Sequence, residues 1–259
     1  MCGSFGETIR PLRSRRACVN AKTGVANLSN TDVVLDNAIW SSLTTRHSNI
    51  AEGKGRARRY PIGVSPLAAI RDASDASFEA LATLLQPDEE IAVGSPTEIV
   101  PVGGLEAFTR MTLRQMVRSS LSRPMTARHV IPLGAADVDD MLALVEITKP
   151  GPFRSRTHEL GQYFGIRVGG RLVAMAGERL RPVRYTEISA VCTHPDYRGR
   201  GYGRDLVETL VRSIIDRGDV PILHVERDNR AVSLYERLGF SIRQTIYLVG
   251  LRKPNSLSS

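Results

Sequence analysis

The chain has 259 residues, 42% hydrophobic and 24% charged, which is the composition of an ordinary globular protein. No apolar run approaches the roughly 18 residues of a membrane-spanning helix and no apolar signal peptide opens the chain, so we expect a soluble, cytoplasmic protein. The net charge of +8 lies mostly in residues 1–59, which hold ten Lys or Arg against four Asp or Glu, and only 5% of residues are aromatic. This distribution argues against a nucleic-acid-binding protein.

The head of the chain is predicted to lie outside the fold. Residues 1–30 carry five basic side chains and one acidic side chain without apolar periodicity. Such a segment is typical of a disordered arm, an arginine-rich transit peptide or an upstream start that is not used. A second basic run over 53–61 is interpreted as a solvated loop. We therefore expect residues 1–59 to be a disordered or non-native extension.

The next segment, residues 60–125, predicts a small α/β unit without recognisable chemistry. Apolar residues recur at helical spacing over 65–86, where Ser65 is placed as the N-cap before a proline. Residues 89–96 predict a short strand that glycine and proline stop. Residues 97–128 fit either a strand or a helix.

Residues 126–254 alternate clearly between strands and helices. Apolar runs bounded by glycine or proline predict strands over 129–134, 162–168, 171–180, 185–193, 221–225, 240–244 and 245–252. Apolar residues at helical spacing predict helices over 135–149, 201–218 and 229–239. Gly169 and Gly170 form a two-residue hairpin turn between the second and third strands. This order predicts an α/β fold in which helices flank a mixed sheet.

The three cysteines, Cys2, Cys18 and Cys192, have neither disulfide nor metal-ligand spacing, so we expect free thiols and no metal site. Cys192 lies beside the glycine-rich turn described next. A nucleophilic role for its thiol competes with the simpler interpretation of a small residue buried in a strand.

A turn between a predicted strand and a predicted helix carries Gly199, Gly201 and Gly203 among three arginines. Glycines let several backbone N–H groups converge on one ligand, and the start of a helix favours an anion such as pyrophosphate. The P-loop spacing GxxxxGK[ST] is absent. A dinucleotide-binding fingerprint would need a glycine where Arg204 stands. Both nucleotide-loop interpretations fail on spacing.

Two segments together carry a family resemblance: EISAVCTHPDYRGRGYGRDL (187–206) and LHVERDNRAVSLYERLGF (223–240). They resemble the GCN5-related N-acetyltransferases (GNAT), and within them the glycine N-acyltransferase-like branch, over about 127–252. The resemblance implies a GNAT fold with splayed central strands over 126–254. It also implies acetyl-CoA as co-substrate and an amine acceptor, whether a small molecule, an amino acid or a protein amino group. Longer acyl groups and a homodimer are compatible with it, and a non-catalytic CoA-binding sensor or interaction module is the alternative.

In this family the RxxGxG motif binds the pyrophosphate of coenzyme A, and here it corresponds to Arg198, Gly201 and Gly203. The resemblance also implies that the backbone of the preceding strand follows the pantetheine arm and offers one N–H to the acyl oxygen. Asn229 stands six residues before the tyrosine of the second segment, against seven in the family, so Asp228 or a helix cap is an alternative for it. The implied cofactor-binding residues are Val191, Cys192, Thr193, Arg198, Gly199, Arg200, Gly201, Tyr202, Gly203, Arg204 and Asn229.

The resemblance implies that Tyr235 is the general acid that protonates the leaving sulfur, against the alternative of a packed helix tyrosine. Two residues compete as general base. Glu187 matches the strand glutamate of histone-type members and is favoured, while His224 stands where ribosomal-protein acetyltransferases carry a glutamate. Direct loss of the proton to water is the third possibility. The implied acceptor pocket is lined by residues 148–161 and 244–250.

Overall fold

The structure is a computed structural model that describes residues 32–118 and 129–255. Within them a single mixed sheet of ten strands confirms the predicted α/β class. From edge to edge the strands are β1 (Ala57–Arg59), β2 (Leu67–Ile70), β3 (Glu90–Ser95), β10 (Phe240–Arg252), β4 (Glu106–Arg118), β9 (Val220–Glu226), β8 (Tyr185–Thr193), β7 (Arg171–Glu178), β6 (Tyr163–Val168) and β5 (Ile131–Leu133). The pairs β2–β3 and β8–β9 are parallel, and the other neighbouring strands are antiparallel.

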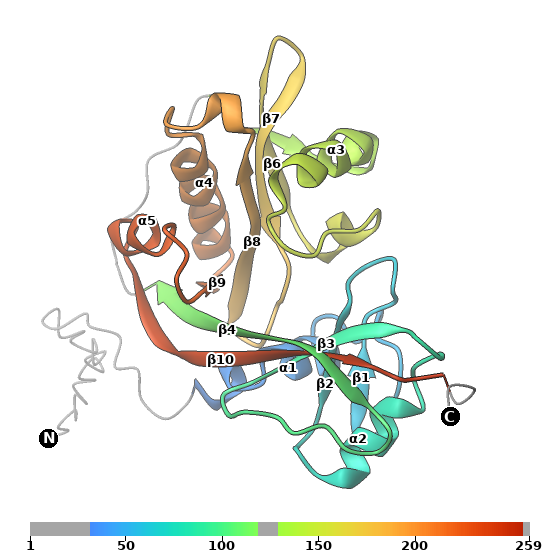
Figure 1. The fold of residues 1–259 in the computed structure, drawn as a ribbon. Coiled ribbons are helices and arrows are strands. Elements are labelled where there is room, and N and C mark those ends of the chain that lie inside the picture. The colour runs from blue at the N-terminus through green and yellow to red at the C-terminus, as the bar shows by residue number, and fades with distance from the viewer. Residues whose placement is uncertain (1–31, 119–128, 256–259) are drawn as a thin grey trace, which may run out of the picture.

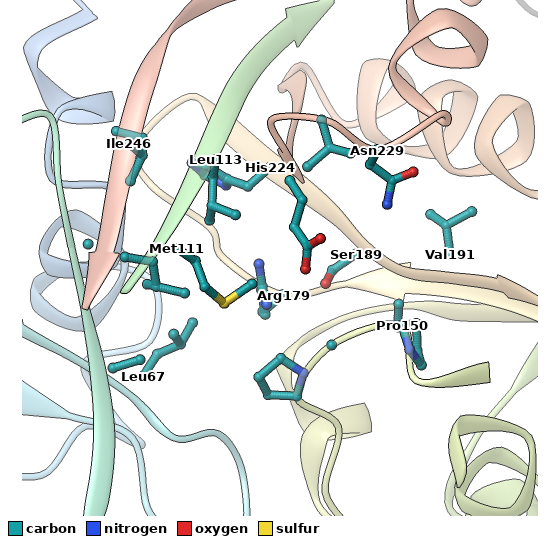
Figure 2. Close-up of a pocket in the computed structure, with 18 of the residues that line it drawn as sticks. Leu67, Met111, Leu113, Pro150, Arg179, Ser189, Val191, His224, Asn229 and Ile246 are labelled. Atoms are coloured by element: carbon teal, nitrogen blue, oxygen red, sulfur yellow. The ribbon is translucent and has the colours of Figure 1, made fainter. Parts of the chain in front are cut away.

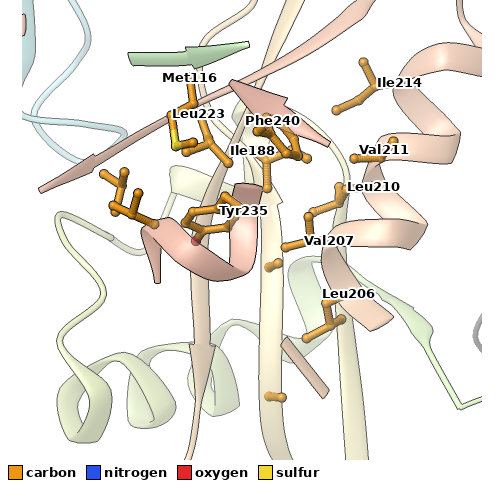
Figure 3. Close-up of a cluster of buried hydrophobic side chains, with 14 of the residues drawn as sticks. Met116, Ile188, Leu206, Val207, Leu210, Val211, Ile214, Leu223, Tyr235 and Phe240 are labelled. Carbon is orange, nitrogen blue, oxygen red and sulfur yellow. The ribbon is translucent and has the colours of Figure 1, made fainter. Parts of the chain in front are cut away.

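Helices α4 (Tyr202–Asp216) and α5 (Val232–Arg237) cover one face of the central strands, and helix α3 (Val138–Thr148) covers the other (Figure 1). Helix α4 packs against β7 and β8, and its apolar residues recur every three or four positions, so they form one buried stripe. Figure 3 shows this stripe, which consists of Leu206, Val207, Leu210, Val211 and Ile214. Helix α5 packs on the same cluster. On the other face, helix α3 buries Met141 and Leu144 against β7.

The two long strands β4 and β10 run from the half that carries α4 and α5 into the half that carries α1 (Ala38–Thr44) and α2 (Asp75–Ala82) (Figure 1). Strand β4 pairs with β9 on one side and with β10 on the other. The two halves therefore share one continuous sheet, although the sequence suggests a boundary near residue 125.

Residues 32–59 are folded, so the predicted disordered extension is wrong for this part, while residues 1–31 lie outside the described residues. The segment forms a 3₁₀ turn, η1 (Asp32–Leu35), then α1 and β1. Leu35 is fully buried in a cluster with Val117, Tyr185 and Ile222. The apolar runs here are too short to show periodicity in the sequence, yet they are buried because the other half of the molecule covers them.

Three other elements differ from the sequence-based prediction, because their strand partners are distant in the sequence. Residues 67–70 form β2 rather than the first turn of a helix, because this buried LAAI segment pairs with strands on both sides. The helix begins later, at Asp75. The Asp72 carboxylate, just before it, accepts a hydrogen bond from the hydroxyl of Ser77 in its first turn at 2.7 Å. Residues 106–118 resolve as strand β4. The two predicted final strands form one strand, β10, with a register shift between Ile242 and Gln244.

None of the helices in residues 32–118 and 129–255 has the length and apolar character needed to cross a membrane.

The burial of the N-terminal segment can be tested at Leu35. We expect Leu35→Ala to lower the free energy of unfolding by about 2–5 kcal/mol, because it leaves a cavity between both halves of the molecule. The matched control is Val33→Ala in the same turn, whose side chain is 66% exposed and whose loss should change stability little. Urea unfolding followed by circular dichroism measures both variants. Equal stabilities for the two would show that residues 32–35 do not pack as described.

Candidate active site

A gap opens where two parallel strands part. Strands β8 and β9 pair from Tyr185↔Val220 to Ile188↔Leu223 and no further. Beyond this point β8 stays with β7, while β9 stays with β4. The register of β7 against β8 also shifts here, and Ala190 adopts a left-handed φ of 53°. At this β-bulge Ala190 and Val191 have no register partner in β7, and β9 has already parted from β8.

The gap leads into a cavity of about 950 Å³. Figure 2 shows Val191 and Asn229 at one end and Leu67 and Ile246 at the other, with His224 between them. Residues 188–193 of β8 form part of the wall at the first end. The cavity therefore extends from the motif strands into the half of the molecule built by the N-terminal residues.

The glycine-rich turn lies at the first end of the cavity. Gly199 and Gly201 have φ values of 77° and 83°, which only glycine adopts easily, and a Cβ at either position would meet no atom within 4 Å. Gly203 lines the cavity in the first turn of α4, where helix N–H groups have no partner within the helix. Arg198 also lines the cavity. This open set of N–H donors and positive charge fits the pyrophosphate of coenzyme A.

The two other arginines of the turn have partners in the protein. The Arg200 guanidinium lies over the Tyr197 ring at 4.9 Å, and Arg204 forms an ion pair with Glu208 at 3.2 Å. Neither arginine lines the cavity. Tyr202 packs against the hydrophobic cluster under α4. The structure thus brings Arg198 and Gly203 to the cavity and leaves these three side chains outside it.

The remaining expected cofactor contacts all line the cavity, but their side chains have different surroundings. They are Val191, Cys192, Thr193 and Asn229. The backbones of Val191, Cys192 and Thr193 follow the gap. The Cys192 thiol is buried in the cluster beneath α3, and burial raises its pKa, so the thiol is a poor nucleophile. The Asn229 side chain accepts a hydrogen bond from the Ala231 N–H at 2.8 Å, which is the geometry of a local turn.

Tyr235 lines the cavity from α5, and its ring packs edge-on against Phe240 (Figure 3). Its hydroxyl has no hydrogen-bond partner among the described residues. Burial raises the pKa of Tyr235 to about 12. The hydroxyl therefore stays protonated at neutral pH and is available to give a proton to a group in the cavity.

Glu187 is fully buried and does not line the cavity. Arg179 binds its carboxylate through two hydrogen bonds of 2.7 and 3.0 Å, and the Leu180 N–H adds a third at 3.2 Å. Burial by itself would raise the pKa of Glu187. The charge of Arg179 and the hydrogen bond to His224 outweigh burial and hold this pKa well below its usual range.

His224 lines the cavity and connects Glu187 to the N-terminal half. Its Nδ1 lies 2.8 Å from Glu187 Oε1, and its Nε2 lies 3.0 Å from the Gln115 amide nitrogen. The Gln115 amide is oriented because its oxygen accepts from Arg243 at 2.9 Å while its nitrogen donates to the Leu35 carbonyl at 2.9 Å. The network therefore assigns the proton of neutral His224 to Nδ1 and the lone pair to Nε2.

Arg179 and Gln115 are site residues that the sequence analysis does not predict. Gln115 lies in the segment that fits strand or helix equally well, and the Arg179 side chain faces Glu187 only after β7 and β8 pair. The expected acceptor segments do reach the cavity, as Thr148 to Pro152, Arg154, Ile246, Leu248 and Gly250. In the described part of the chain, no group of His, Cys, Asp or Glu side chains is arranged to hold a metal ion.

Comparison with known proteins identifies the family. A family described as FR47-like protein matches residues 163–249. A putative acetyltransferase of the GNAT family from Novosphingobium aromaticivorans is 36% identical, with a TM-score of 0.81, over 86% of this chain and 99% of that structure. The chain belongs to the GNAT family of acetyltransferases. This confirms the predicted enzyme class.

The chain spans about half or less of the length of the curated relatives cited here. The N-alpha-acetyltransferase RimI of Mycobacterium tuberculosis is 40% identical over 98 residues, which are 35% of this chain and 55% of the relative. The mycothiol acetyltransferase of Corynebacterium aurimucosum is 45% identical over 62 residues, which are 23% of this chain and 20% of the relative. A GCN5-related N-acetyltransferase from Kribbella flavida, with a TM-score of 0.59 and 16% identity, shares the fold.

The buried ion pair gives a pH-dependent stability that can be measured. We expect Glu187→Gln to lower the free energy of unfolding at pH 7 by about 3–5 kcal/mol, because it leaves the Arg179 charge buried without its partner. The folded pKa of Glu187 is depressed, so the carboxylate stabilises fully above its unfolded pKa of about 4.5, and this stabilisation is lost as the pH falls further.

Urea unfolding of the wild type and Glu187→Gln from pH 8 to pH 3.5 tests this. The difference between their free energies of unfolding should become smaller below about pH 4.5. Glu159→Gln is the matched control, since it breaks the exposed Arg156–Glu159 pair and should have a much smaller effect. If the difference in free energy of unfolding does not change with pH, Glu187 is not the buried carboxylate described here.

Proposed function

We propose that this protein is an acetyl-CoA-dependent N-acetyltransferase that transfers the acyl group directly to a primary amine. One observation carries the proposal: the gap between β8 and β9, Arg198 and Gly203 of the glycine-rich turn, and the side chains of Tyr235 and His224 all line one cavity. The relatives cited above are all named acetyltransferases, which supports acetyl as the acyl group. Membership of the glycine N-acyltransferase-like branch is part of the proposal and rests on the two motif segments.

The residues at the first end of the cavity are suited to hold the co-substrate. The N–H groups of residues 199–204 and the side chain of Arg198 would bind the pyrophosphate, and the β8 wall of the gap would hold the pantetheine arm. Acetyl-CoA supplies an acyl group activated as a thioester. The bulge at Ala190 and Val191 would offer a backbone N–H to the acyl oxygen, an effect worth about 3–4 kcal/mol in other enzymes.

The structure favours His224 over Glu187 as the general base, the reverse of the order expected from the sequence. Glu187 is buried away from the cavity with its carboxylate occupied by Arg179 and its pKa depressed. His224 lines the cavity with a lone pair on Nε2. The role assigned to Glu187 is to accept from Nδ1 and hold this tautomer, so that an amine which displaces Gln115 from Nε2 loses its proton there.

The proton balance closes with Tyr235. As the amine nitrogen bonds to the acyl carbon, one amine proton passes to His224 Nε2. The carbon–sulfur bond breaks, and the Tyr235 hydroxyl gives its proton to the leaving sulfur. Its raised pKa keeps Tyr235 protonated until the thiolate forms. Solvent then takes the proton from His224 and returns one to Tyr235, so both residues regain their starting forms.

Binding of the co-substrate can be tested without turnover. We expect Gly203→Glu to weaken acetyl-CoA binding by about 10²-fold or more, because the new carboxylate would stand at the pyrophosphate site. Gly134→Glu is the control: it adds the same charge at a glycine that lies outside the cavity and has no atom within 4 Å of its Cβ position. Isothermal titration measures both. Absence of acetyl-CoA binding to the wild type would refute the proposed function.

The base assignment can be tested by pH–rate profiles with thiol release as readout. We expect His224→Ala to lower kcat/KM by about 10²–10⁴-fold and to abolish the acidic limb of the profile. Glu187→Gln should lower the rate but retain that limb, because the imidazole that takes the proton is still present. If instead only Glu187→Gln abolishes the acidic limb, Glu187 is the base.

A further inference from the structure

The cavity continues beyond His224 into a chamber between α1 and strands β2, β3, β4 and β10. Figure 2 shows Leu67, Met111, Leu113 and Ile246 directed into this end. We call this region the apolar chamber. Its wall consists of Ile39, Leu67, Ala92, Gly94, Met111, Leu113, Ile246 and Leu248. Met111 is 37% exposed, so part of this apolar wall is accessible rather than packed.

Gly94 keeps the apolar chamber open. It lies inside β3, paired with Leu248, and its φ is not in the left-handed region, so the backbone itself does not require glycine. A Cβ on Gly94 would lie 3.4 Å from Ile246 Cγ2 and 3.6 Å from Ile39 Cδ1. Glycine weakens a strand interior and often marks a place where a ligand approaches closely. Here the missing side chain leaves space among side chains of the chamber wall.

Among the charged residues that line the cavity, Arg179 and Asp36 are paired within the protein, and Glu90 is exposed to solvent. The Arg179 charge at its entrance is neutralised by Glu187. Asp36 also lines the cavity, but its carboxylate accepts from Arg243 at 2.7 Å and from Gln244 at 3.1 Å. A polar ligand body would therefore lose its hydration in the chamber without gaining equivalent partners.

The position of the chamber indicates which substrate it holds. If the acyl carbon lies at the β8 bulge, the attacking nitrogen lies between Val191 and His224. The rest of the acceptor then extends past His224, which is the direction of the chamber (Figure 2). We infer that the apolar chamber binds the body of the acceptor, and that the preferred substrates are primary amines carrying an aliphatic or aromatic group of several carbons. This inference rests on the proposed N-acetyltransferase function.

The test uses the full-length protein, acetyl-CoA and the series propylamine, butylamine and hexylamine. For the wild type, kcat/KM should rise about fourfold for each added methylene, the value expected for burial of one CH₂ group. Gly94→Leu should remove this rise, so that hexylamine loses far more of its kcat/KM than propylamine does. Gly94→Ala, whose Cβ makes only ordinary contacts, should give an intermediate slope. Gly134→Leu, outside the cavity, is the matched control and should behave as the wild type.

Three outcomes would overturn the inference: a flat amine series in the wild type, equal losses for all amines in Gly94→Leu, or a chain-length effect that appears with acyl-CoAs instead. The last is measured with propylamine and acyl-CoAs of two to eight carbons, and a loss restricted to the longer acyl-CoAs would assign the chamber to the acyl chain. If acetyl-CoA binds but no amine is turned over, the proposed function fails. Calorimetric binding of hexylamine to the wild type and Gly94→Leu still tests the chamber in that case.

Discussion

The structure depends on the parting of β8 and β9 after Ile188 and Leu223. Two parallel strands that separate would normally leave two rows of backbone groups without partners. Here β7 and β4 each keep one side of the separated strands paired, so the unpaired groups are confined to the gap itself. Ala190 and Val191, at the bulge, line the cavity. The helix start at Gly201 stands beside the same opening, which concentrates backbone donors where a phosphate-bearing thioester can lie.

A buried polar network joins this gap to the N-terminal half of the molecule. It runs from Arg179 through Glu187 and His224 to Gln115, and from there to the Leu35 carbonyl and Arg243. Each member satisfies the next, which is the condition under which buried polar groups are tolerated. Because Gln115 and the Leu35 carbonyl belong to the N-terminal half, that half helps to set the tautomer of the proposed base as well as the shape of the acceptor site.

In the proposed function, different parts of the molecule line the two ends of the cavity: one end binds the acyl donor, and the apolar chamber binds the acceptor. In that function, the motif-bearing elements β8, β9, α4 and α5 supply the groups that bind and activate the acyl donor. Strands β3, β4 and β10, together with α1, supply apolar walls and a glycine that keeps the space between them open. If the inferred acceptor site is right, residues near the start of the folded chain contribute to selectivity at a site whose catalytic side chains lie more than a hundred residues later in the sequence.

The sequence by itself determined the features that depend on local spacing: the helix stripe of α4, the hairpin at Gly169-Gly170, the glycine turn at 199–203 and the family resemblance carried by two segments. Only the tertiary structure decided which short apolar runs are buried, as with Leu35 and β2, and which of two candidate bases reaches the cavity. The physical reason is that burial and hydrogen bonding depend on partners distant in the chain. Gln115 and His224 are separated by 109 positions, and no local pattern records that they meet.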